Sequence, residues 1–105
     1  MAAYCFFDVR KITDKDKAAA YRSRVFATVE RYGGRYLVLG GSCDAVEGSW
    51  QPGIAVIIEF PSLAQAHRWY DSDDYNPLKA LRLAATEGSA VFLEGYEPEA
   101  QANHA

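Results

Sequence analysis

The segment Ile54–Phe60, apolar except for Glu59, constrains the fold more than any other part of this 105-residue chain. Its branched and aromatic side chains are typical of a buried strand. Pro61 ends the segment. Ser62, with Gln65 three residues later, then forms a capping box that predicts a short helix to about Asp71. A buried strand that leads directly into a helix predicts helices packed against a sheet.

Three more segments are rich in aromatic and branched residues and predict strands. They span residues 4–9, 35–43 and 89–96. The sequence Gln51-Pro52-Gly53-Ile54 has proline and glycine at the positions that favour a type II turn. This turn is expected to join the segment that ends near Trp50 to the apolar strand, as a hairpin.

The helices have recognisable ends. Tyr21, Val25 and Val29 recur at helical spacing and predict a helix over about 15–32, which Thr13 can cap. The glycine pair 33–34 supplies the left-handed conformation that ends a helix. Further along, Pro77 interrupts the helix that begins after Ser62 and suits the first turn of a second piece, to about residue 87.

The element order β-α-β-β-α-β predicts one α+β domain over residues 1–96, with a ferredoxin-like four-stranded antiparallel sheet. Alternation places Val56 and Ile58 on one face of the sheet and Ala55 and Ile57 on the other. Both faces are apolar, and two helices can cover only one. We therefore predict a homodimer whose sheets close into a barrel-like core, with residues 97–105 as a flexible tail.

Composition excludes several partners. The net charge is −3, and the eleven Lys and Arg residues are scattered, which argues against nucleic acid and anionic membranes. The sequence shows no secretory signal and no spanning segment, so a cytoplasmic location is expected. Cys5 and Cys43 lie far apart without metal or redox spacing, which favours reduced packing thiols over a disulfide or a reactive thiol.

Several short motifs follow one another along most of the chain. They are Arg35-Tyr36, Gly40-Gly41, Glu47-Gly48-Ser49-Trp50 with Pro52, Ile58-Glu59-Phe60-Pro61-Ser62, Trp69-Tyr70 with Ser72 and Tyr75, Arg82, and Glu94-Gly95. In this order they resemble the bacterial family called domain of unknown function 1330, over about residues 4–96.

The resemblance implies the dimeric α/β-barrel superfamily, which includes cofactor-independent monooxygenases of antibiotic biosynthesis, muconolactone isomerase and some haem-using enzymes. It also implies a ligand cleft within each protomer, between sheet and helices. It implies no reaction, because the family has no established activity and a shared fold does not carry chemistry.

Two residues are candidates for proton transfer. Glu59 ends an apolar strand, where burial would raise the pKa of its carboxyl and make it a useful base; alternatively, it is a hydrated rim residue paired with an arginine. His67 can move a proton or bind iron, or it is a solvated residue on the helix surface. No second His or Cys lies at ligand spacing from it, so no metal site is predicted.

Five residues are candidates for ligand binding. Trp69, Tyr70 and Tyr75 form either an aromatic wall for a planar ligand or part of the core. Arg35 and Arg82 can grip a carboxylate, or they pair with glutamates of the chain. We expect Tyr70 in the core and Tyr75 at the mouth of a cleft.

We also expect Glu59 and Arg82 to share one polar cluster at that cleft. The resulting hypothesis is a homodimer that binds a small aromatic or acidic metabolite, with no cofactor. A cofactor-independent enzyme of the monooxygenase or isomerase type is one form of this hypothesis. The alternative is a non-catalytic binding protein or a stress or interaction protein.

Overall fold

The computed structural model describes residues 1–98 of the protein, and most of the predicted 97–105 tail lies outside this range. Four strands and three helices follow one another along the chain. They are β1 (Ala3–Ile12), α1 (Lys15–Arg31), β2 (Arg35–Leu39), β3 (Ile54–Phe60), α2 (Leu63–Tyr70), α3 (Asn76–Ala85) and β4 (Thr86–Glu94). The predicted order of elements, including the broken second helix, is confirmed.

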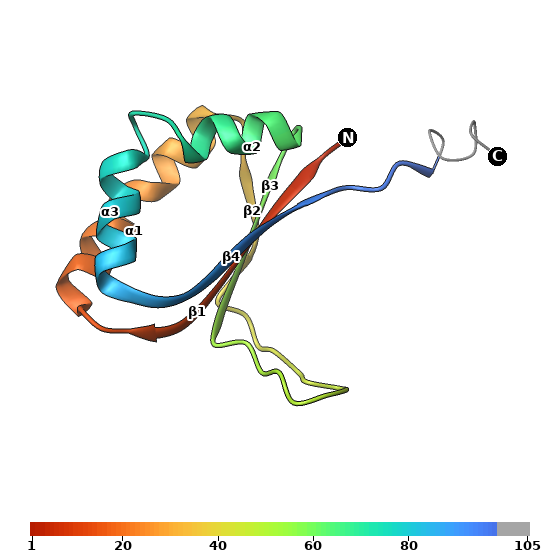
Figure 1. The fold of residues 1–105 in the computed structure, drawn as a ribbon. Coiled ribbons are helices and arrows are strands. Elements are labelled where there is room, and N and C mark those ends of the chain that lie inside the picture. The colour runs from red at the N-terminus through yellow and green to blue at the C-terminus, as the bar shows by residue number, and fades with distance from the viewer. Residues whose placement is uncertain (99–105) are drawn as a thin grey trace.

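The four strands form one sheet in the order β2-β3-β1-β4, and all neighbouring strands are antiparallel. Figure 1 shows the three helices gathered on one side of this sheet. We call the side that carries the helices the covered face and the other side the open face. This arrangement is the predicted ferredoxin-like α+β fold.

Local sequence signals explain where the helices begin and end. The Asp14 carboxylate accepts the Lys17 backbone N–H at the start of α1, so Asp14 is the cap instead of the expected Thr13. The Ser62 hydroxyl accepts the Gln65 backbone N–H at the start of α2, as the capping box predicts. Gly33 has φ +83°, the left-handed conformation that stops α1.

The hairpin of β2 and β3 differs from its prediction. Gly40 adopts φ +70°, which ends β2 at Leu39 instead of near residue 43. Residues 41–53 form no strand, so the hairpin is closed by a long loop that includes Trp50. The expected type II turn is wrong, because Gly53 lacks the positive φ that such a turn needs at its third position.

Alternation along the central strands builds the core on the covered face. Cys5 and Phe7 of β1 face the same way as their β3 neighbours Ile58 and Val56. Trp69 of α2 is fully buried in this core and contacts the rings of Phe7 and Phe60. Truncation of such a residue removes contacts to two strands at once.

The open face is also apolar, as the alternation predicts. Its larger apolar side chains are Tyr4, Phe6, Val38, Ile57, Val91 and Leu93. Val91 and Leu93 are 49% and 54% exposed. No helix of the described chain covers this face, so several large apolar groups remain in contact with water.

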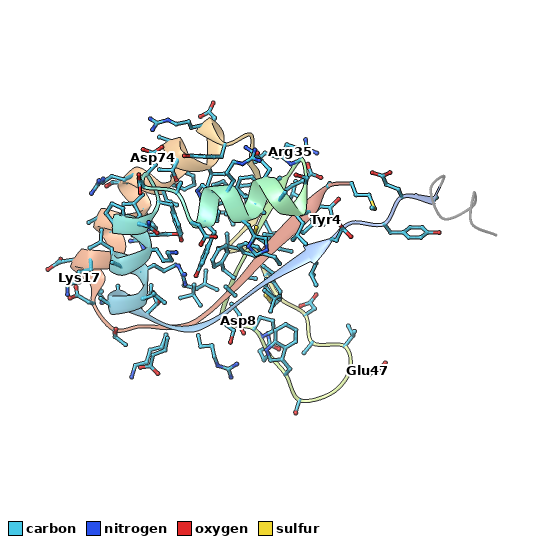
Figure 2. All side chains as sticks on the ribbon, turned by 45° about the horizontal axis from the view of Figure 1, so that its top comes forward. Tyr4, Asp8, Lys17, Arg35, Glu47 and Asp74 are labelled. Atoms are coloured by element: carbon cyan, nitrogen blue, oxygen red, sulfur yellow. The ribbon has the colours of Figure 1, made fainter. Side chains whose placement is uncertain are left out.

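Part of the long loop folds against the open face. The Trp50 ring packs edge-on against Phe6, and its Nε1–H donates to the Asp8 carboxylate at 3.3 Å. The other oxygen of Asp8 accepts the Gly53 backbone N–H at 2.9 Å. Figure 2 shows Asp8 near the base of the loop that carries Glu47. Asp8 therefore anchors this loop to the sheet.

Both cysteines are free thiols, in line with their spacing in the sequence. Burial raises the pKa of the Cys5 thiol to about 12, so Cys5 is protonated at neutral pH and serves as a packing residue. Among the described helices, none is both long and apolar enough to cross a membrane.

Candidate functional site

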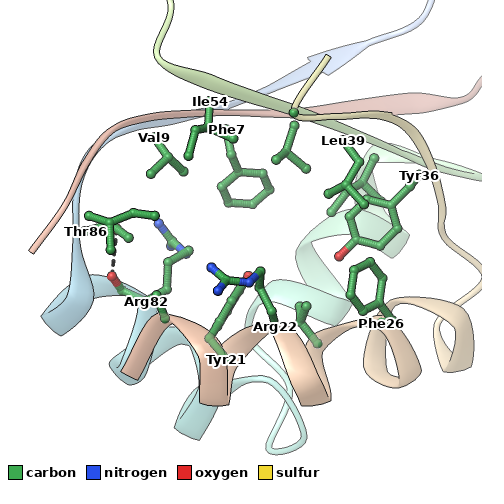
Figure 3. A pocket seen from close by; sticks show the side chains of 16 residues that line it. Phe7, Val9, Tyr21, Arg22, Phe26, Tyr36, Leu39, Ile54, Arg82 and Thr86 are labelled. Atoms are coloured by element: carbon green, nitrogen blue, oxygen red, sulfur yellow. Dashed lines mark hydrogen bonds between the residues drawn. The ribbon is translucent and has the colours of Figure 1, made fainter. Parts of the chain in front are cut away.

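A cavity of about 280 Å³ lies between α1 and the covered face of the sheet. Figure 3 shows side chains from α1, from Arg82 of α3 and from the strands pointing into it. Its walls are Phe7, Val9, Ile12, Ala18, Tyr21, Arg22, Val25, Phe26, Tyr36, Leu39, Gly40, Ile54, Val56, Ile58, Arg82 and Thr86. Most of these side chains are apolar, so the cavity suits a small organic molecule.

Two charged residues line the cavity, and the less exposed of them is Arg82 of α3. Its Nε–H donates to the Tyr75 hydroxyl at 3.2 Å, and its Nη2 donates to the Tyr70 hydroxyl at 3.4 Å. The guanidinium carbon lies 5.1 Å from the centre of the Phe7 ring, a cation–π distance. Three aromatic side chains therefore fix the position of the guanidinium beside the cavity.

Tyr21 of α1, which lines the cavity, meets Tyr75 in the turn just before α3. The hydroxyls of Tyr21 and Tyr75 are 2.9 Å apart, and either can be the donor. Burial raises the pKa of Tyr21, and the neighbouring Tyr75 raises it further. Burial also raises the pKa of Tyr75, although the Arg82 charge partly opposes this. Both phenols are therefore neutral at physiological pH and can donate hydrogen bonds.

The local charge is positive. Burial lowers the pKa of Arg82, but the hydroxyl groups of Tyr75, Tyr21 and Tyr70 outweigh this effect and raise it overall. Arg82 is therefore charged. Arg22 of α1 also lines the cavity, and none of the described lining residues is Asp, Glu or His. The cavity thus combines apolar walls with two cations.

Two predicted site residues lie on the other side of the sheet. Glu59 follows Ile58, which faces the helices, so its side chain points to the open face, where it pairs with Arg35 at 2.6 Å. The expected cluster of Glu59 and Arg82 is therefore wrong, because the sheet separates them. The arginine-paired alternative for Glu59 matches the structure.

Trp69 occupies the core position that was one of its two expected alternatives, whereas Tyr75 and Tyr70 occupy positions that differ from expectation. Trp69 is fully buried, and its Nε1–H donates to the Thr28 hydroxyl at 3.1 Å, so it belongs to the core and not to the cavity wall. Tyr75 is 0% exposed, which corrects its expected position at the mouth of a cleft. Tyr70, expected in the core, is instead half-buried and stacks edge-on against Phe92.

His67 lies on the exposed surface of α2, where its ring is 5.1 Å from that of Phe92. It does not line the cavity that contains Arg82. Within residues 1–98, no three His, Cys, Asp or Glu side chains lie close enough together to hold a metal ion.

Among the residues that line the cavity, only Arg82 was predicted as a site residue, so the polar side chains of Tyr21, Arg22 and Tyr36 were missed. A signal for Tyr21 was present, because it lies on the same helical stripe as Val25 and Val29. A tyrosine on a buried apolar stripe needs a partner for its hydroxyl, and Tyr75 provides it. Tyr36 packs against Phe26 of α1 at 4.9 Å and closes one end of the cavity.

The structure is a ferredoxin-like domain with a cavity between α1 and the sheet. The chain belongs to the family described as domain of unknown function (DUF1330), whose model matches residues 2–96. This confirms the family to which the sequence motifs pointed.

Solved structures with the same fold are also similar to the chain. One is the RPA0582 protein of unknown function from Rhodopseudomonas palustris, with 21% identity, a TM-score of 0.71, and coverage of 92% of this chain and 84% of that one. The methylated RPA0582 protein gives 22% identity, the same TM-score, and coverage of 92% and 82%. These similarities support the fold.

A putative antibiotic biosynthesis monooxygenase from Nitrosomonas europaea is more distant, with 13% identity, a TM-score of 0.48, and coverage of 92% of this chain and 90% of that one. Among curated proteins, none matches the chain.

Proposed function

We propose that the protein is a homodimer in which each protomer binds a small, largely apolar metabolite in the cavity between α1 and the sheet. The observation that carries this proposal is the cavity itself: about 280 Å³, apolar walls and a fixed cation beside it. A preformed apolar pocket with a few oriented polar groups is the usual form of a small-molecule site.

The open face supports the dimer. It exposes Val91 and Leu93 and carries Phe6 and Ile57 in its centre. Burial of apolar surface contributes about 25 cal/mol per Å², so covering this face with a second copy is strongly favourable. A two-fold axis allows the same patch to meet itself. The free Cys5 and Cys43 thiols support a cytoplasmic location.

We favour binding over catalysis. A proton-abstracting enzyme needs a base within hydrogen-bond reach of the ligand. Glu59 lies on the open face and His67 on the outer surface of α2, so neither candidate base lines the cavity. The tyrosines near Arg82 are neutral phenols, which suit ligand orientation better than proton abstraction.

Native mass spectrometry of the protein with a mixture of metabolites tests this function. We expect a dimer that retains up to one ligand per protomer. Val56→Trp fills the cavity from β3 and should abolish retention, whereas Ala84→Trp places a tryptophan at an exposed position of α3 and should not. Equal retention by wild type and Val56→Trp, or retention by neither, would refute the proposed site.

A further inference from the structure

Arg82 has hydrogen-bonding capacity that the chain does not use. A guanidinium carries five N–H groups, and two of them donate to Tyr75 and Tyr70, which leaves three. No fully buried side-chain nitrogen or oxygen in residues 1–98 lacks a partner. The Arg82 Nη1 atom makes no hydrogen bond within residues 1–98, so it cannot be fully buried, and the space that Arg82 lines is the cavity.

The charge of Arg82 is also uncompensated within the described chain. Arg10, Arg31 and Arg35 are exposed, yet each pairs with a carboxylate, at 3.7, 3.1 and 2.6 Å. Arg82 is half-buried, and among residues 1–98 its partners are neutral hydroxyls. A buried charge normally requires an opposite charge, because desolvation is expensive. This site therefore favours an anion from outside the chain.

The shape of the cavity orients such an anion. Phe26, Leu39 and Ile54 line the cavity and are 42%, 57% and 43% exposed, so they form its apolar rim. Arg82 lies farther from solvent and is held by Tyr75, which is fully buried. A ligand would therefore place its anionic end inside and its apolar body toward the rim (Figure 3).

We infer that the ligand class is an apolar monocarboxylic acid, bound with its carboxylate on the free N–H groups of Arg82 and its hydrocarbon part against Phe26, Leu39 and Ile54. This inference rests on the proposed function and specifies its ligand. A carboxylate matches the planar fork of a guanidinium and the single positive charge at the inner end. Arg22, which reaches the same cavity from α1, adds long-range attraction for the anion.

Matched acid and amide probes test the inference. The pairs are benzoate with benzamide, cinnamate with cinnamamide, and octanoate with octanamide, measured by isothermal titration calorimetry with the wild-type protein. Each pair keeps the hydrocarbon part and removes the charge. For the pair whose hydrocarbon part fits the cavity best, we expect the acid to bind about 10-fold or more tightly than its amide.

Variants of the arginines show which residue causes the preference for the acid over its amide. Arg82→Gln should bring the acid down to the affinity of its amide, and Arg82→Lys should retain part of the preference because it retains the charge. Arg31→Gln, on the outer side of α1, is the matched control and should leave both affinities unchanged. If Arg22→Gln abolishes the preference while Arg82→Gln retains it, the assignment to Arg82 is overturned.

Failure of the inference and of the proposed function can be distinguished. Equal affinity of acid and amide, with both abolished by Val56→Trp, would overturn the carboxylate inference and leave the binding function intact. No binding of any probe in any pair would overturn both. The wild-type comparison gives its result even if an Arg82 variant does not fold.

Discussion

The two faces of the sheet have similar strand residues but opposite surroundings. On the covered face, helices bury Phe7 and Ile58, and the half-buried Arg82 has no carboxylate partner within residues 1–98. On the open face, Val91 remains half-exposed, and the exposed Arg35 pairs with Glu59. Thus the half-buried Arg82 has no oppositely charged partner within residues 1–98, and the apolar open face has no helix to cover it.

This contrast fits the two roles that we propose for the sheet. A cavity with an uncompensated cation suits a small anionic molecule, whereas a broad apolar surface with satisfied charges suits another protein surface. One sheet can serve both purposes because alternation sends neighbouring residues, such as Ile57 and Ile58, to opposite sides.

The largest expected effect is on the open face. Ile57→Glu places a charge in the centre of the proposed dimer contact, where an unpaired buried carboxylate costs about 4 kcal/mol, or about 1000-fold in the dissociation constant. Sedimentation velocity should then show a folded species of 11.6 kDa instead of twice that mass. Leu83→Glu, at a 63% exposed position of α3, is the control and should remain dimeric. A monomeric wild type would contradict the proposed dimer contact on the open face.

The next largest effect is the difference in unfolding free energy lost on truncating the two tryptophans. Trp69→Ala removes a fully buried side chain from the covered face and should lower the free energy of unfolding by about 3–5 kcal/mol. Trp50 is 54% exposed beside the open face, so Trp50→Ala should cost about 1 kcal/mol. Urea denaturation at one protein concentration measures both. Similar losses would mean that the loop around Trp50 is as well packed as the core.

A smaller effect is expected where Arg82 is held. Tyr75→Phe removes the oxygen that accepts the Arg82 Nε–H and contacts Tyr21, and hydrogen bonds to charged groups contribute about 1.5–3 kcal/mol. Tyr70→Phe removes a longer contact at a half-buried position and should cost less. Thermal and urea unfolding of the two variants measure this difference. A larger loss of unfolding free energy in Tyr70→Phe than in Tyr75→Phe would contradict the account that Tyr75 is the main hydrogen-bond partner of Arg82.

The smallest effect is expected for the exposed ion pair. Arg35→Gln breaks the contact with Glu59, but the Arg35 side chain is 73% exposed, so the loss should be at most about 1 kcal/mol. Added salt should reduce the difference between wild type and variant. A loss well above this value would show that a partner surface buries the pair.

Much of the fold could be predicted from the sequence because its signals are local. The apolar strand that ends at Pro61, the Ser62 cap and the break at Pro77 each act over a few residues, and the structure confirms the elements that they define. The end of β2 was harder to place. It depends on the positive φ of Gly40, which composition alone does not reveal.

The site was less predictable because it depends on which face the helices cover. The alternation of Ile58, Glu59 and Phe60 already places Glu59 opposite its neighbours, so its separation from Arg82 follows once the covered face is known. The meeting of Tyr21 and Tyr75 joins residues 54 positions apart, and no local pattern encodes such a contact.

Methyl NMR on protein labelled at Ile, Leu and Val, titrated with cinnamate, tests the different roles of the two faces most directly. The methyl signals of Val25 and Ile58, which line the cavity, should shift in a saturable manner. Those of Ile57 and Val91, on the open face, should remain in place. Shifts confined to Ile57 and Val91, or unchanged Val25 and Ile58 signals, would contradict the account.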